Sequence, residues 1–122
     1  MESIEKGKGL TPPFRLALGF SQGAGLLSVI SQKEPSRFRG IGLLAGFVIQ
    51  ISLAEHGKEE LPSILVCHGS LDELVTTERA LSGVQYLRSL GASVEYVEDP
   101  VGHKVGTAAM RRLKSWFGEF AP

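Results

Sequence analysis

A pentapeptide of the form G-x-S-x-G occupies residues 19–23, with Ser21 at its centre. Serine nucleophiles with this pattern stand on a sharp turn between a strand and a helix. We expect the turn to be so tight that Gly19 and Gly23 must both lack a side chain. The N–H of Gln22, at the helix N-terminus, would then face the oxyanion of a tetrahedral intermediate. With 15 glycines in the chain, the pentapeptide alone is weak evidence, because a Gly-rich turn that packs a helix on a sheet has the same form.

A serine hydroxyl needs a base to remove its proton, and the chain has three histidines. His56 lies in a polar stretch and is expected to be solvated. His68 stands where a strand should end, which favours a histidine that caps backbone groups. His103 lies in a loop between the last predicted strand and the last predicted helix. We therefore predict that His103 is the base, the alternative being a structural loop histidine.

The acid that orients the base should also follow the carboxyl end of a strand. Asp72 meets this condition, because it comes shortly after the strand that ends near Cys67. Asp99 competes with it, but it lies only four residues before His103 and would have difficulty reaching the outer imidazole nitrogen. Glu73 should point elsewhere. The resulting chain order of nucleophile, acid and base is the order of α/β-hydrolases.

The predicted elements would bring these residues together. Short apolar runs predict strands, and helical spacing predicts helices between them: strands at 14–20, 40–49, 63–67 and 94–97, helices at 21–32, 76–90 and 106–120, and a helical turn or surface loop at 52–60. This alternation predicts an α/β fold with about four parallel strands and flanking helices. Carboxyl ends of parallel strands share one edge, so Ser21, Asp72 and His103 should meet there.

The same helical spacing predicts the apolar sides of two helices. In the first helix Leu26, Leu27 and Ile30 should lie on one side. In the last helix the predicted apolar set is Met110, Leu113, Trp116, Phe117 and Phe120. Residues 1–13 are interpreted as a polar lead-in, and residues 14–122 as the C-terminal catalytic part of a hydrolase domain.

Composition narrows the class of protein. The 122 residues suit one domain, and 13 basic against 13 acidic residues disfavour a nucleic-acid partner. A single cysteine, Cys67, indicates a reducing compartment. The N-terminus lacks the apolar stretch of a signal peptide, and the most apolar segment, 41–51, is too short for a membrane span. We therefore expect a cytoplasmic protein without an integral membrane segment. No cluster has metal-ligand spacing, so no metal is expected.

Three segments resemble the phospholipase/carboxylesterase group that includes acyl-protein thioesterases: Gly19-Phe20-Ser21-Gln22-Gly23, the H-G-x-x-D-x-x-V stretch at 68–75, and Gly102-His103. The likeness runs from Phe14 to Phe120. It implies a partial α/β-hydrolase fold, hydrolysis of small carboxylic esters or thioesters without metal or organic cofactor, and a triad at Ser21, Asp72 and His103. Small serine hydrolases linked to growth control share the elbow, but the segment around Asp72 fits them less well. A dienelactone-hydrolase-like enzyme would carry cysteine at position 21.

The resemblance also implies a departure. Members of the group carry about a hundred further residues ahead of the elbow strand, including a loop that supplies a second oxyanion N–H. We therefore expect weak or no activity from residues 1–122 alone, and self-association through an exposed edge at the elbow strand. The alternative function is a non-catalytic remnant that binds a partner or an acyl ligand.

Overall fold

The computed structural model describes residues 15–120, so the predicted lead-in at 1–13 lies outside the described residues. Its centre is one sheet of four parallel strands in the order β1-β2-β3-β4: β1 (Leu16–Phe20), β2 (Gly40–Leu44), β3 (Ser63–Gly69) and β4 (Val94–Asp99). Since neighbours in sequence are neighbours in the sheet, β1 and β4 are its two edges. The carboxyl ends of all four strands open on the same side.

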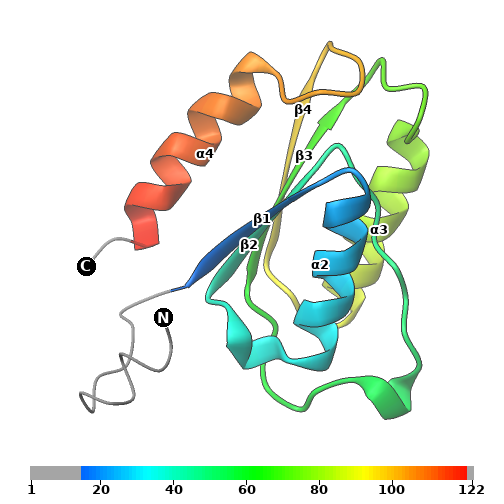
Figure 1. Cartoon of the computed structure of the whole chain (residues 1–122), viewed down its shortest axis with the longest axis vertical. Coiled ribbons are helices and arrows are strands. Elements are labelled where there is room, and N and C mark those ends of the chain that lie inside the picture. Colours follow the sequence, from blue (N-terminus) through cyan, green and yellow to red (C-terminus); the bar gives the residue numbers. More distant parts are fainter. Residues whose placement is uncertain (1–14, 121–122) are drawn as a thin grey trace.

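Three helices cover the sheet in the described part of the chain: α2 (Gln22–Lys33), α3 (Thr77–Ser89) and α4 (Thr107–Phe120). The helices α2 and α3 lie on one face, and α4 lies on the other (Figure 1). Two short 3-10 turns, η1 (Pro35–Arg37) and η2 (Leu53–Glu55), lie in the connections. The prediction of an α/β fold with four parallel strands and flanking helices is confirmed.

Each face of the sheet has its own apolar core, because side chains alternate between the faces along each strand. The α2 and α3 side is built from the following buried residues: Ala24, Leu27, Ile41, Leu43, Ile64, Val66, Val84 and Leu87. The α4 side is built from Leu44, Leu65, Cys67, Ala109, Leu113 and Trp116. Sheet and helices are therefore held together on both faces, which fixes the strand ends that carry the site.

The second strand is shorter than predicted. It ends at Leu44 rather than at Ile49, because Ala45 takes a positive φ of 49° and turns the chain out of the sheet. Beyond this turn the chain runs against α2, where the N–H of Ile49 donates to the hydroxyl of Ser28 at 3.0 Å. The third and fourth strands are each two residues longer than predicted, reaching Gly69 and Asp99.

The predicted apolar sides of the helices are only partly buried. Leu26 is 63% exposed, so it does not share a buried side with Leu27. In α4, Leu113 and Trp116 are buried as expected, but Met110 and Phe117 are 57% and 40% exposed. Among residues 15–120, the helices are too short and too polar to cross a membrane.

Candidate active site

Ser21 stands on a strained turn between β1 and α2. Its backbone has φ 57° and ψ −116°, a conformation that costs a residue other than glycine about 1–3 kcal/mol. Two backbone hydrogen bonds hold the turn, one from the N–H of Ser21 to the carbonyl of Leu44 at 2.8 Å, the other from the N–H of Ala24 to the carbonyl of Ser21 at 3.0 Å. The serine hydroxyl is therefore presented at the carboxyl edge of the sheet by backbone contacts.

The two glycines of the pentapeptide are not equivalent. A Cβ at Gly19 would lie 2.5 Å from the carbonyl oxygen of Gly23, so a side chain there would force the turn apart. A Cβ at Gly23 would meet nothing within 4 Å among the described residues. The expectation that both positions must lack a side chain is therefore correct for Gly19 and wrong for Gly23.

Gln22 is the first residue of α2. An N–H in the first turn of a helix has no carbonyl partner within the helix, and the helix dipole makes this end attractive to negative charge. The N–H of Gln22 directly follows the serine, so it is available to a negatively charged oxygen formed beside the hydroxyl. The side chain of Gln22 is exposed and has no part in this arrangement.

His103 lies between Ser21 and Asp72 and contacts both. Its Nε2 is 2.9 Å from the Ser21 Oγ, and its Nδ1 is 2.7 Å from the Asp72 Oδ2. Tertiary structure alone brings the three together, since Ser21 and His103 are 82 positions apart. The ring also packs against Phe20, with ring centroids 5.2 Å apart, and the His103 side chain is 20% exposed. Nothing in the sequence pattern indicates this contact, because Phe20 occupies a variable position of the pentapeptide.

Asp72 is fully buried at its side chain and is fixed through both carboxylate oxygens. Its Oδ1 accepts hydrogen bonds from the backbone N–H groups of Leu74 and Val75, at 2.8 and 2.9 Å, and its Oδ2 faces His103. Burial by itself would raise the pKa of Asp72, but the hydrogen bonds from Val75, His103 and Leu74 outweigh it and lower that pKa below its usual value. The carboxylate therefore stays charged beside the imidazole.

The competing acids lie elsewhere. Asp99 is buried at the end of β4, where its two oxygens accept the backbone N–H groups of Ala108 and Ala109, each at 3.0 Å. It therefore anchors the first turn of α4. Glu73 is exposed. The structure thus brings Asp72 to His103 and leaves Asp99 and Glu73 away from it.

The other two histidines do not reach Ser21. The Nε2 of His68 lies 2.6 Å from the backbone carbonyl of Val75, in line with the expectation of a histidine that binds backbone. His56 is only partly exposed rather than solvated, and its Nε2 is 3.3 Å from the hydroxyl of Tyr86. Residues 15–120 contain no group of three or more His, Cys, Asp or Glu side chains placed to hold a metal ion.

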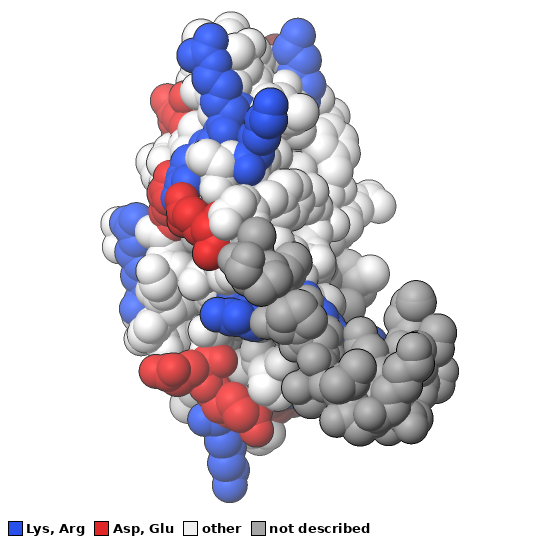
Figure 2. Space-filling view, turned by 90° about the vertical axis from the view of Figure 1, so that its left-hand side faces the viewer, with Lys and Arg blue, Asp and Glu red and all other residues white. Residues whose placement is uncertain are grey.

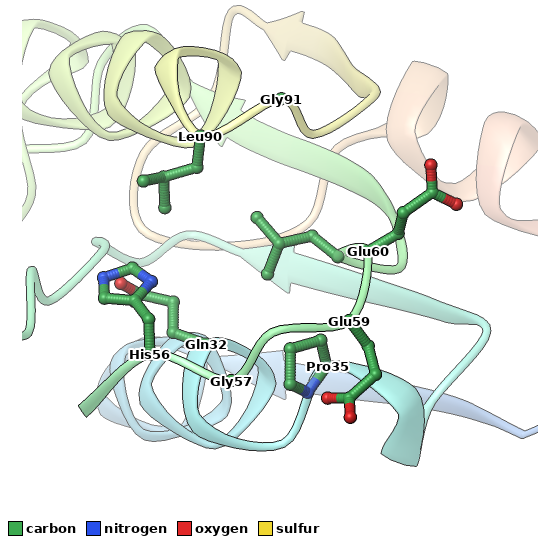
Figure 3. Close-up of a pocket in the computed structure, with 9 residues that line it drawn as sticks. Gln32, Pro35, His56, Gly57, Glu59, Glu60, Leu90 and Gly91 are labelled. Carbon is green, nitrogen blue, oxygen red and sulfur yellow. The ribbon is translucent and has the colours of Figure 1, made fainter. Parts of the chain in front are cut away.

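His56 also borders a cavity of about 280 Å³ at the opposite end of the sheet, where the strands begin. Figure 3 shows Gln32 and His56 on one side of this cavity and Leu90 on the other. Gln32 is fully buried, and its side chain bonds the carbonyls of Ser28 and Ile49 and the hydroxyl of Tyr86. These contacts tie α2 to the loop after β2 and to α3, so Gln32 has a structural part.

The chain matches a model of the phospholipase/carboxylesterase family over residues 4–118. It is 29% identical over 103 residues to lysophospholipase-like protein 1 of Mus musculus, covering 80% of this chain and 43% of that protein. It is 28% identical over 116 residues to a probable carboxylesterase of Oryza sativa subsp. japonica, covering 92% and 44%. The chain thus spans less than half the length of these two relatives.

Solved structures give the same fold. The chain superposes on SOBER1 of Arabidopsis thaliana with a TM-score of 0.79 and 26% identity, covering 98% of this chain and 59% of that one. It superposes on esterase PE8 with a TM-score of 0.82 and 22% identity, covering 98% and 56%. Since the family model spans residues 4–118, nearly all of the sequence, the chain belongs to the phospholipase/carboxylesterase family.

Proposed function

We propose that this chain supplies the nucleophile, base and orienting acid of a serine hydrolase that acts on carboxylic esters or thioesters. The supporting observation is the continuous hydrogen-bond chain from the Ser21 hydroxyl through His103 to Asp72. Membership of a family of phospholipases and carboxylesterases supports the same class of reaction. No cofactor enters this proposal.

The chemistry would proceed in two halves. In the first, Ser21 Oγ attacks the carbonyl carbon while His103 Nε2 takes the hydroxyl proton, and the resulting oxyanion accepts the N–H of Gln22. Collapse of this intermediate breaks the bond to the alcohol or thiol, which leaves with the proton from His103, and the acyl group stays on Ser21. In the second half, water attacks the acyl-enzyme with His103 again as base, which releases the carboxylic acid and regenerates Ser21.

Asp72 would act through His103. Its Oδ2 accepts the Nδ1 proton, which leaves Nε2 free to receive the proton of Ser21. It also stabilises the imidazolium that forms when Nε2 is protonated. Only one oxyanion donor, Gln22, enters the proposal from residues 15–120, and loss of one donor costs about 10²–10³ in rate. We therefore propose that residues 1–122 alone react slowly.

The test is a slow labelling experiment with a fluorophosphonate probe, followed for hours, together with hydrolysis of p-nitrophenyl butyrate. Wild-type protein should label at Ser21, and Ser21→Ala should abolish both labelling and hydrolysis. Ser70→Ala is a matched control, because Ser70 is exposed just after β3 and takes no part in the hydrogen-bond chain. If the probe never modifies Ser21, the non-catalytic alternative is the better account of this chain.

We further propose that the chain associates with a second copy of itself at the β1 edge. Leu18 and Phe20 on β1 are 44% and 46% exposed, whereas the β4 edge exposes Glu95 and Glu98. An open strand edge with apolar side chains favours pairing with another chain, and charged side chains oppose it. A groove of about 540 Å³ adjoins β1, lined by Leu18, Leu44, Val105, Met110, Arg111, Leu113, Lys114 and Phe117. Figure 2 shows the α4 side of the molecule, with a broad uncharged area beside its Lys and Arg side chains.

Analytical ultracentrifugation tests this extension. Wild-type protein should form dimers or larger species as its concentration rises. Leu18→Lys should shift the distribution toward monomer, because it places a charge on the open edge. Leu53→Lys is the matched control, since Leu53 is 86% exposed in η2. A wild-type protein that stays monomeric at every concentration would rule out self-association.

The single free cysteine, Cys67, is consistent with the further proposal of a cytoplasmic location.

A further inference from the structure

His68 is a buried histidine that lies close to the proposed site and has no part in its chemistry. It is the sixth residue of β3, and its side chain is fully buried. The two residues before it on the same face of the strand, Ile64 and Val66, belong to the apolar core. A polar ring among apolar neighbours is costly unless its nitrogens find partners. Its contacts therefore show what it does there.

The contacts fix which nitrogen carries the proton. Nε2 lies 2.6 Å from the backbone carbonyl of Val75, and a carbonyl only accepts, so Nε2 must donate. Nδ1 is buried with no partner among the described residues. With the proton on Nε2, the hydrogen bond to Val75 is made, and Nδ1 is an acceptor rather than a donor without an acceptor. The tautomer with its hydrogen on Nε2 is therefore the one that this surrounding favours.

This hydrogen bond holds the segment that aims Asp72. Val75, whose carbonyl accepts from His68, also donates its N–H to the Asp72 Oδ1 at 2.9 Å. The other oxygen, Oδ2, contacts His103. His68 thus clamps one end of the tight turn at 72–75 to β3, and the turn sets the direction of the carboxylate. Nε2 of His68 is 3.9 Å from Oδ2, too far for a hydrogen bond.

We propose that His68 is a positioning residue for Asp72, acting through Val75 to keep the carboxylate aligned with the Nδ1 of His103. This inference rests on the proposed function, because it assigns His68 a role in the same site. His68 would then serve the alignment of Asp72 as well as the packing of the core. Loss of its N–H should misalign Asp72, and small misplacements of catalytic groups cost up to about 10²-fold in rate.

Two substitutions at His68 distinguish the effect of losing the N–H donor from the effect of losing the ring. His68→Leu replaces the ring with a branched apolar side chain and removes the donor. His68→Gln keeps an N–H group at about the distance of Nε2 from the backbone. Val66→Ala is the control for stability alone, because Val66 is buried on the same face of β3 and makes no polar contact with the turn. The melting temperature of each variant is measured alongside.

Two readouts are used on the whole chain. The first is the low-field proton NMR signal of the His103 Nδ1–H bonded to Asp72, which needs no turnover. The second is the rate of fluorophosphonate labelling of Ser21. His68→Leu should lose or shift the signal and slow labelling by about 10- to 100-fold. His68→Gln should restore both, and Val66→Ala should keep both despite a lower melting temperature.

The proposal is overturned if His68→Leu keeps the wild-type signal, or if Val66→Ala loses it to the same extent. If His68→Leu does not fold, His68→Asn replaces it, because its shorter amide places the donor at the position of Nδ1 and cannot reach Val75. A wild-type chain that shows the signal but never labels at Ser21 would defeat the proposed function. The NMR comparison of the His68 variants would still decide the positioning role.

Discussion

Replacing Asp72 by asparagine is the sharpest test of the proposed hydrogen-bond chain, because the structure dictates how the amide must sit. The Oδ1 of Asp72 accepts two backbone N–H groups, from Leu74 and Val75. An amide NH₂ at that place would set donors against donors, so the amide oxygen must take the Oδ1 position. The NH₂ group then faces the Nδ1 of His103, where the carboxylate Oδ2 stood.

The consequence is an imidazole with its proton on the wrong nitrogen. Nδ1 must accept from the NH₂ group, so the proton moves to Nε2, which can then no longer take the proton of Ser21. The equivalent change in a serine protease triad lowers kcat by about 10⁴. This corresponds to about 5.4 kcal/mol of transition-state stabilisation, at 1.36 kcal/mol for each factor of ten. Folding should change little, because both backbone hydrogen bonds keep an acceptor.

The assay compares the rate of fluorophosphonate labelling at Ser21 for Asp72→Asn, Asp99→Asn and wild type. Asp99 is the matched control, since it is an equally buried carboxylate that binds the first turn of α4. Asp99→Asn should lower the melting temperature and leave labelling within a few-fold of wild type. If Asp72→Asn labels as fast as wild type, or if the two variants slow it equally, the assignment of Asp72 to the orienting role is refuted.

Three further outcomes are expected. Gly19→Ala should destabilise the fold and slow labelling, because its Cβ would lie 2.5 Å from the carbonyl oxygen of Gly23. Gly23→Ala should be tolerated, because its Cβ would meet nothing within 4 Å among the described residues. Thermal melts and labelling rates measure the effect of both changes. Cys67 should resist iodoacetamide in the folded protein and react only in denaturant, since burial raises the pKa of its thiol to about 12. Asp72 has a folded pKa below its unfolded value, so its contribution to stability is present above that unfolded value and is lost as pH falls through the folded one. Melting temperatures from about pH 5 to about pH 2 should therefore fall more steeply for wild type than for Asp72→Asn.

The sequence is enough to predict the edge of the sheet at which Ser21, Asp72 and His103 come together, because this prediction needs few assumptions. If the strands are parallel, the loops after residues 20, 67 and 97 must open at one edge of the sheet. The choice of Asp72 over Asp99 followed from the short spacing between Asp99 and His103. The spacing could not reveal that Asp99 has a structural role. Its carboxylate accepts hydrogen bonds from two backbone N–H groups at the start of α4.

Backbone detail was harder to anticipate, because it depends on contacts between distant segments. The apolar run from Gly40 continues past Leu44, and its glycines do not mark the turn at Ala45, because they stand inside the strand at 40 and 42 as well as after the turn at 46. The strand stops there because the following segment binds the polar side chains of Ser28 and Gln32 on α2. The close approach at Gly19 and the open space at Gly23 likewise depend on the path of the helix, so the pentapeptide pattern could not distinguish them.

Two apolar residues of α4, Met110 and Phe117, are exposed, and they mark a surface that the described residues do not cover. Helical spacing identifies the apolar stripe of α4 but does not say how much of it the rest of the fold covers. Leu113 and Trp116 reach the sheet and are buried, while Met110 and Phe117 lie toward the groove beside β1 and stay exposed. No other part of residues 15–120 buries these two side chains. The edge strand β1 lies beside them. The exposed apolar side chains of α4 and the outer edge of β1, which has no partner strand among residues 15–120, therefore lie side by side, and this is the side at which we propose that another chain pairs.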